Sequence, residues 1–273
     1  LELDWDGNAV WVYEDPNLHH DVSRAPNGNT FVLGWEPVRQ DLASDVRGGI
    51  PGSEPDEHLW CDYINEVTPE GKIEWEWHAQ DALDVNEDVI CGLHPRHEWT
   101  HANACTVLPD GNVLTSFRVT NTLAIVDRTT KRFAWKYSDV ELGHQHDPTL
   151  LDNGNVLVFA NGMHVPNNPN SRLFEIDIKK DEIVWRYESK PLWEFFSGFI
   201  SGAQRLPNSN TLVCEGMTGR LFEITLDGQV VWEYVVPFFA DHPRHGYVNS
   251  CFRTRRYAPD HPAFIGKSLV PQR

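Results

Sequence analysis

The stretch LFEIDIKKDEIVWRY, residues 173–187, decides the fold. Apolar and polar residues alternate on both sides of the turn at residues 178–182, as in two antiparallel strands joined in a hairpin. The second strand carries a tryptophan, and a tryptophan strand of this kind occurs five times: at Trp11, Trp75, Trp135, Trp185 and Trp232. Such self-similarity predicts one small unit that is repeated and stacked.

A second hairpin comes earlier in each unit. Its turns fall at residues 27–29, 110–112, 153–155 and 208–210, which are built from Asn, Gly, Asp and Ser. These residue types tolerate the backbone conformations of tight turns, so each unit contains four strands. Successive tryptophans are 64, 60, 50 and 47 residues apart, which is close to the period of propeller blades.

We therefore predict an all-β fold, a β-propeller of five four-stranded blades in which residues 1–273 form a single domain. Residues 1–16 resemble the last two strands of a unit, and VNSCFRTRRYAP at 248–259 resembles the first strands of another. Pairing of the N- and C-terminal strands is expected to complete the fifth blade and remove an exposed edge. The alternative is six blades, with the sixth upstream of Leu1 or within residues 36–60.

Two long segments interrupt the repeat, at residues 36–60 and 79–97. The first is rich in Gly, Pro and acidic residues, and both are expected to be loops. The motif HPRH occurs at 94–97 and again at 242–245. These residues either surround the entrance of a central channel or lie on solvated loops.

The chain carries a formal net charge of −17, from 40 acidic and 23 basic residues. This balance repels nucleic acid and anionic membranes, and no apolar run reaches the roughly 20 residues of a membrane helix. Nucleic-acid binding and membrane insertion are not expected, and the oligomeric state is open. The sequence starts at Leu1 rather than Met, so a periplasmic or secreted location remains open if a signal was removed upstream.

The five cysteines show no CxxC spacing. They are expected to be buried free thiols, and one or two disulfides remain an alternative for an exported protein. The repeated tryptophans are expected to fill the cores of the blades.

Histidines recur at matching places in the units. Alignment on the first turn puts His20, Asn103, His146 and Ser201 at one position, and the innermost strands of a propeller bring such positions together around a central channel. Because strand side chains alternate, the residues two earlier face the same way, and these include His101 and His144. Imidazoles that converge from three units predict a functional channel rather than a structural core.

Arg118 lies in LTSFRVTN, among apolar and small residues. If it faces the channel, its guanidinium offers a fork of donors suited to sulfate, phosphate or carboxylate, and Asn103 adds a neutral donor. The other interpretation is an arginine on a strand surface. His144, Ser201 and Asn249 are predicted to bind substrate.

With these residues in place, the chain resembles the bacterial arylsulfate sulfotransferases. The resemblance is carried by LHHDVSRAPNGN (18–29), EWTHANACTVLPDGNVLTSFR (98–118) and GHQHDPTLLDNGNVLVFANG (143–162). It implies a propeller enzyme that moves a sulfuryl group from an aryl sulfate to a phenol through a sulfated histidine, without a cofactor. The nucleophile is then His146, assisted by His20, His101, Asn103 and Arg118. The N-terminal β-domain and sixth blade of that family are not seen.

Two other functions remain open. His20, His101 and His146, with His144 nearby, would also suit a divalent transition metal and a hydrolase, lyase or oxygenase reaction. A propeller that binds a ligand or partner without catalysis is the second alternative. For the sulfotransferase and for the metal-dependent enzyme, the expected partner is a small aromatic or anionic molecule.

Overall fold

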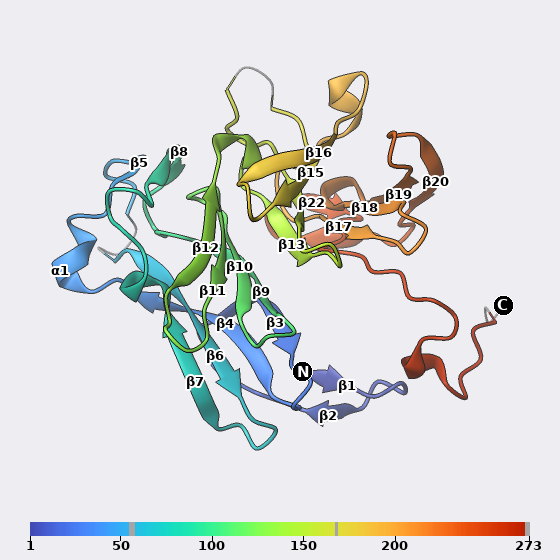
Figure 1. Ribbon diagram of the computed structural model, residues 1–273, viewed down its shortest axis with the longest axis horizontal. Helices are drawn as coiled ribbons and strands as arrows, with labels where there is room; N and C mark the ends of the chain where they lie inside the picture. The colour runs from blue at the N-terminus through green and yellow to red at the C-terminus, as the bar shows by residue number, and fades with distance from the viewer. Residues whose placement is uncertain (55–57, 167–168, 271–273) are drawn as a thin grey trace.

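Four antiparallel sheets of four strands each dominate the structure, a computed structural model that describes residues 1–54, 58–166 and 169–270 (Figure 1). We call them blades one to four. Blade one contains β3 (Leu18–Arg24), β4 (Thr30–Pro37), β6 (Trp60–Val67) and β7 (Ile73–His78), and blade two contains β9 (Ala102–Val107), β10 (Val113–Phe117), β11 (Thr122–Val126) and β12 (Phe133–Ser138).

The other two blades follow the same order along the chain. Blade three contains β13 (His146–Leu150), β14 (Val156–Ala160), β15 (Arg172–Asp177) and β16 (Glu182–Tyr187), and blade four contains β17 (Gly202–Arg205), β18 (Thr211–Glu215), β19 (Arg220–Ile224) and β20 (Val230–Val235). The prediction of an all-β fold built from four-stranded units is thus confirmed.

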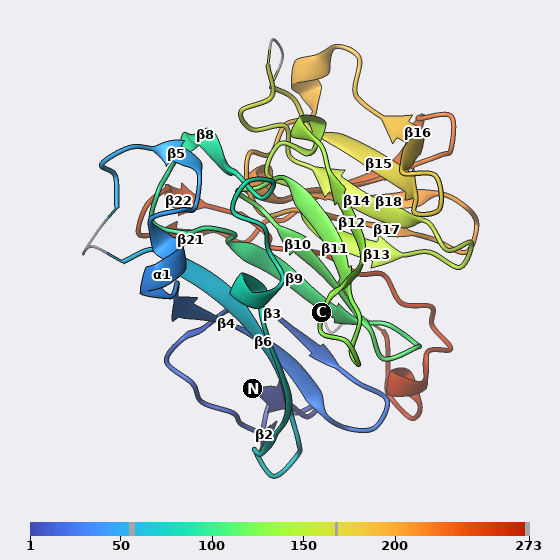
Figure 2. The same ribbon diagram turned by 60° about the vertical axis from the view of Figure 1, so that its left-hand side comes forward.

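The first strands of successive blades lie next to one another. β3 contacts β9, β9 contacts β13, and β13 contacts β17, and Figure 2 shows these strands gathered on the inner side of the sheets. Hydrophobic cores fill the spaces between neighbouring blades, with Trp77 stacked on Phe117 between blades one and two and Phe195 against Phe222 between blades three and four. Residues that precede or begin the inner strands are therefore brought close together.

The predicted closure by strand pairing is wrong. β1 (Glu2–Leu3) pairs only with β2 (Ala9–Trp11), and β21 (Ala240–His242) pairs only with β22 (Gly246–Val248), within the described residues. The sheets are not closed into a ring, and neither five nor six blades is confirmed.

The segment that was expected to form the closing strands runs beside β17 without joining a sheet. Ser201 N donates to Phe252 O at 2.9 Å, and Cys251 N donates to Gly216 O at 2.8 Å. Three of its residues, Arg253, Arg255 and Arg256, instead form ion pairs with the carboxylates of three blades, on Asp21, Asp147 and Glu223. Three arginines in four positions break the alternation of a half-buried strand, which explains the error.

The two predicted loops contain short ordered elements. Helix α1 (Gln40–Ala43) and strand β5 (Gly48–Ile50) lie in the first, and β8 (Ile90–Pro95) in the second pairs in parallel with β5. Residues 55–57 of the first loop lie outside the described residues. One-turn 3-10 helices complete the description, at Ala79–Asp81, Val140–Leu142, Leu192–Glu194, Gly216–Thr218 and Pro262–Phe264. No helix of the described residues is long and apolar enough to cross a membrane.

The repeated tryptophans connect blades, and Trp75, Trp135 and Trp185 also pack against the hydrophobic cores. Each indole N–H from one unit donates to the turn between the third and fourth strands of the next unit. The four bonds run from Trp11 to Pro69 O (3.0 Å), Trp75 to Arg128 O (2.9 Å), Trp135 to Asp181 Oδ1 (2.8 Å) and Trp185 to Leu226 O (2.9 Å). Trp232 is 41% exposed and has no such acceptor among the described residues, because no further four-stranded sheet follows blade four there.

Candidate active site

His146 begins β13 and is buried, with 4% of its surface exposed. Its Nδ1 lies 2.7 Å from Oδ1 of Asn161. The Asn161 amide group donates to Ser197 O at 2.7 Å and to Ile200 O at 2.9 Å. Since both amide hydrogens are committed, Oδ1 must accept, and His146 carries its hydrogen on Nδ1. The lone pair on Nε2 is left for another group.

The electrostatic surroundings of His146 favour a neutral ring. Burial lowers the pKa of His146 to about 3, and the charge of Arg118 adds to this effect while the hydrogen bond with Asn161 opposes it. A neutral imidazole with a free Nε2 is the form in which histidine acts as a nucleophile. Asn161 lies in the motif VFANG, but sequence reasoning did not single it out, because its role depends on a contact across blade three.

His20 and His101 come from blades one and two and lie edge to face, with ring centroids 4.6 Å apart. The Nδ1 of His101 pairs closely with Glu98, whose other oxygen lies 3.3 Å from Nε2 of His97. Although burial raises the pKa of Glu98, the hydrogen bonds from His101 and His97 lower it well below its usual range. Glu98 is therefore ionised and holds His101 in a fixed orientation.

His19 is the more enclosed member of the HisHis pair in blade one. Its ring stacks on Trp35 with centroids 4.2 Å apart, and its Nε2 lies 3.1 Å from the buried Asp62. Its Nδ1 is 2.8 Å from Nδ1 of His20, which is exposed. Although His20 keeps part of its surface in solvent, desolvation of its ring by neighbouring side chains lowers its pKa, and the imidazoles of His101 and His19 add to this effect. The sequence alignment selected His20 but missed His19, although the His19 ring supports the His20 ring.

Arg118 follows β10 and is partly buried. Its Nη1 donates to Nε2 of His94 at 3.0 Å, since Nδ1 of His94 donates to Pro95 O at 3.0 Å. Its backbone N–H donates to His101 O at 3.1 Å. The charge of Arg118 lies close enough to lower the pKa of His146 and His94, so a permanent cation stands beside the imidazoles.

Asn103 lies on β9 and is 2% exposed. Its Nδ2 donates to Gln145 O at 2.8 Å, one residue before His146, while its Oδ1 has no partner among the described residues. Gln145 is fully buried and is itself fixed by bonds to Ser116 Oγ and Thr122 O. Asn103 is thereby held beside the start of β13.

A family model described as arylsulfotransferase (ASST) matches residues 1–236, and this range contains every residue of the arrangement just described. The chain belongs to the arylsulfotransferase family. The resemblance stated from the sequence is confirmed, and membership indicates a sulfotransferase-like enzyme that acts on an aryl compound.

Solved structures resemble this arylsulfotransferase-family chain in fold. A protein of unknown function from Bacteroides caccae aligns with a TM-score of 0.52 and 17% identity, over 84% of this chain and 72% of that one. A streptogramin B lyase aligns with a TM-score of 0.48 and 12% identity, over 82% and 56%. The Dos1 propeller aligns with a TM-score of 0.49 and 11% identity, over 85% and 52%. The chain thus spans little more than half of the last two. No curated protein matches it.

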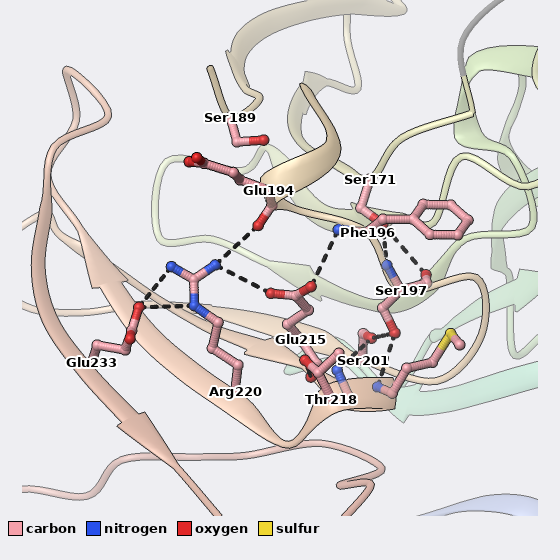
Figure 3. A network of polar contacts seen from close by, with 12 residues as sticks. Ser171, Ser189, Glu194, Phe196, Ser197, Ser201, Glu215, Thr218, Arg220 and Glu233 are labelled. Carbon is pink, nitrogen blue, oxygen red and sulfur yellow. Dashed lines mark hydrogen bonds and ion pairs between the residues drawn. The ribbon is translucent and has the colours of Figure 1, made fainter. Parts of the chain in front are cut away.

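Two predicted substrate-binding residues of this family member form hydrogen bonds with groups other than the histidines. Ser201 belongs to a polar network of blade four (Figure 3): its Oγ lies 2.8 Å from Ser197 Oγ and accepts from Gly216 N at 2.9 Å. Asn249 donates to Val236 O at 2.9 Å. Neither forms a hydrogen bond with the histidines among the described residues, and their substrate-binding role stays a prediction.

The backbone at the start of the inner strands departs from the regular alternation that the alignment assumed. His20, His101, His144 and Ser201 have φ angles of 52°, 50°, 67° and 88°, a left-handed region that costs a non-glycine residue about 1–3 kcal/mol. Pairing also shifts register between Leu18 and Val22 and between His146 and Thr149. A simple alternation of side chains therefore does not hold there, and strained residues gather where the inner strands begin.

Two carboxylates that follow the histidines connect the inner strands. Asp21 Oδ2 accepts from Cys105 N at 3.0 Å, and Asp147 Oδ2 accepts from Ala203 N at 3.1 Å. Each bond joins one blade to an inner strand of another blade. The signal for these residues was the HisAsp dipeptide in LHHD and GHQHDP, which the sequence reasoning used only for its histidine.

The structure brings together a group of metal-ligating side chains that differs from the predicted set. Within the described residues, one group of three or more ligating side chains has its donor atoms within 4.8 Å of one another, and it consists of Cys91, His144 and His164. Of the alternative ligands His20, His101, His146 and His144, only His144 belongs to it. All five cysteines are free thiols, with Cys61, Cys105 and Cys214 buried and Cys91 and Cys251 partly exposed.

Proposed function

We propose that this arylsulfotransferase-family chain transfers a sulfuryl group from an aryl sulfate to a phenol by way of a sulfated His146, in a channel between the inner strands. The observation that carries the proposal is the Asn161 contact, because it fixes the hydrogen of His146 on Nδ1 and leaves a neutral Nε2. Such a nitrogen attacks an electrophilic sulfur without first losing a proton.

In the first half of the reaction, His146 Nε2 forms a bond to sulfur while the bond from sulfur to the aryl oxygen breaks. The electron pair of that bond leaves with the phenolate. His101, oriented by Glu98, donates a proton to this oxygen. The ring of His146 then carries the sulfuryl group on Nε2 and its hydrogen on Nδ1, where Asn161 accepts it.

In the second half, the acceptor phenol attacks the sulfuryl group and its proton passes to His101. The bond between sulfur and Nε2 breaks, and the electron pair returns to His146. The proton that His101 gave to the first phenolate is thereby replaced, so no cofactor or net proton source is needed. Arg118 and Asn103 stabilise charge on the sulfuryl oxygens through donors that are already held in place.

Transfer from nitrophenyl sulfate to a phenol tests the proposal, together with mass spectrometry of the protein after brief exposure to the donor. We expect a sulfuryl adduct on His146, and no turnover in His146→Ala. His261→Ala is the matched control, because His261 lies in the C-terminal 3-10 turn outside the blades. An adduct on another residue, or normal turnover in His146→Ala, would refute the assignment of the nucleophile. Ligand binding without turnover in the wild type would favour a non-catalytic propeller.

A further inference from the structure

Cys91, His144 and His164 converge from three separate segments. Cys91 lies on β8, His144 lies just before β13, and His164 lies in the segment that follows β14. The Sγ of Cys91 is 3.4 Å from Nδ1 of His164, and the ring centroids of His144 and His164 are 4.7 Å apart. The proposed sulfuryl transfer does not use Cys91 or His164.

Backbone contacts hold these segments together. Cys91 N donates to Val119 O at 2.8 Å, and Met163 N donates to Gly143 O at 2.9 Å. A side chain on Gly143 would meet the Cα of Gly162 at 2.5 Å, so the two turns that carry His144 and His164 pack backbone against backbone. The three ligating groups are therefore brought together by rigid contacts of the fold.

His144 supplies an independent observation. It is fully buried, with 0% exposure, and neither ring nitrogen has a hydrogen-bond partner among the described residues. Buried polar groups in native proteins are almost always paired, because an unpaired one loses its water without compensation. A buried, unpaired imidazole next to a thiol and a second imidazole is placed as a metal ligand would be.

We infer that Cys91, His144 and His164 bind a zinc-type divalent ion, with one thiolate and two neutral imidazoles as ligands. Binding releases the Cys91 thiol proton, and the ion takes its place between Sγ and Nδ1 of His164. Zinc bonds of about 2.0–2.3 Å put tetrahedral ligand atoms roughly 3.3–3.8 Å apart. The contact between Cys91 and His164 already has this length at 3.4 Å, and the group as a whole spans no more than 4.8 Å.

The chemistry of the group favours zinc over the hard cations. Sulfur and imidazole are the ligands of zinc, cobalt and copper, whereas magnesium and calcium take oxygen ligands. Arg118, which contacts His94 at 3.0 Å, brings a cation near the group, and the Cys91 thiolate offsets part of its repulsion of the ion. The ion would link β8 to the two turns and leave His146 Nε2 free.

Metal titration of the full chain tests this inference without reference to sulfuryl transfer. We expect one Zn²⁺ per chain by calorimetry, and Co²⁺ to give the near-ultraviolet charge-transfer band of a cobalt–thiolate bond. Cys91→Ser should remove that band and weaken Zn²⁺ binding at least about tenfold, since even indirect partners of a metal ligand contribute this much. Cys251→Ser is the matched control, because Cys251 is also partly exposed and free, and it should bind the metal normally.

His164→Asn provides a second test that is mild for the fold. His164 has a φ of 61°, and asparagine is among the residues that tolerate this conformation. Zinc affinity should again fall at least about tenfold, while circular dichroism and unfolding without metal match the wild type. The inference is overturned if the wild type binds no stoichiometric zinc, if cobalt shows no thiolate band, or if both variants bind zinc as the wild type does. Because binding is measured, these outcomes are separate from any failure of sulfuryl transfer.

Discussion

Nδ1 of His146 donates its hydrogen to Oδ1 of Asn161 across 2.7 Å, and Asn161 is itself fixed by two backbone carbonyls. Replacement of Asn161 by Ala should therefore leave His146 in place but free its tautomer and ring orientation. We expect kcat for nitrophenyl sulfate to fall about 10–100-fold, as for other residues that orient a reactive imidazole, with KM nearly unchanged. Asn155→Ala, in a tight turn of the same blade, is the control. A kcat within twofold of wild type would show that Asn161 is only structural.

Arg118 differs from lysine in the geometry of its charge. A guanidinium presents a planar fork of donors, whereas an ammonium is a compact point charge. If Arg118 binds two sulfuryl oxygens, Arg118→Lys should lose about 10²–10³ in kcat, the range for removal of one preorganised donor to a developing anion. Steady-state kinetics with one donor and one acceptor measure this. Equal activity of the lysine and arginine enzymes would mean that only the charge at this position matters.

The exposed Trp232 offers an internal control for the bonds between blades. Trp185→Phe keeps an aromatic ring but removes the N–H that donates to Leu226 O at 2.9 Å, so the free energy of unfolding should fall by about 1 kcal/mol. Trp232→Phe should change the free energy of unfolding by only a few tenths of a kcal/mol, because this indole N–H has no acceptor on a following blade among the described residues. Urea unfolding followed by circular dichroism distinguishes the two. Equal losses in both variants would contradict an inter-blade role for the repeated tryptophans.

The repeat could be predicted from sequence because its signals are local. Alternation and tight turns specify each hairpin within about 15 residues, and the four sheets follow from them. The conformation of residues 248–259 does not follow from local signals. It depends on long-range contacts such as the ion pair between Arg255 and Asp147, which are 108 positions apart. A pattern of apolar and polar residues does not encode such a partner.

The residues of the candidate site likewise fall into those with a periodic sequence signal and those without one. Counting from the turns selected His20 and His101, which lie with ring centroids 4.6 Å apart, and the roles of both remain predictions. At Ser201 a φ of 88° departs from strand geometry, and the predicted role of this residue stays a prediction. The count gave no sign of Asn161 or Cys91, because a single asparagine or cysteine carries no periodic signal. Their significance lies in what the fold places beside them.

The pair of Glu98 and His97 should make the free energy of unfolding depend on pH. The pKa of Glu98 is lowered, so its contribution is present above the usual glutamate value of 4.5 and is lost as pH falls below it. The pKa of His97 is raised by its hydrogen bond to Glu98, so its contribution is present below 6.5 and is lost as pH rises through the folded value. The difference in unfolding free energy between wild type and Glu98→Gln should therefore be largest between about pH 5 and 6.5.

Urea unfolding of both proteins at several pH values checks this window. The difference should become smaller as pH rises through the raised pKa of His97. It should also become smaller towards pH 3, as carboxylates of the unfolded chain take up protons. Glu70→Gln, in the exposed turn of blade one, should show no such maximum. A difference that rises steadily with pH would mean that His97 does not contribute to the pair.

The C-terminal arginines should hold the inner strands together in place of a closing strand. Asp147 is buried, and burial raises the pKa of its carboxyl group, an effect that the hydrogen bond and ion pair with Arg255 offset only in part. Arg255→Ala leaves this carboxylate with Ala203 N at 3.1 Å and with Arg253 at 3.5 Å. Loss of one partner of a buried pair costs about 3–5 kcal/mol, and the partial exposure of Arg255 and the remaining contacts reduce the expected loss to about 2 kcal/mol.

Asp147→Asn combined with Arg255→Ala identifies the source of that loss. The double variant should be more stable than Arg255→Ala alone, because no buried charge is then left without its partner. Arg244→Ala, at an exposed arginine near β22, serves as the control and should unfold like wild type. Limited proteolysis should cut residues 249–256 faster in Arg255→Ala than in the control. If Arg255→Ala unfolds at the wild-type urea concentration and resists proteolysis equally, the segment is held by its backbone bonds to Ser201 and Gly216 rather than by its arginines.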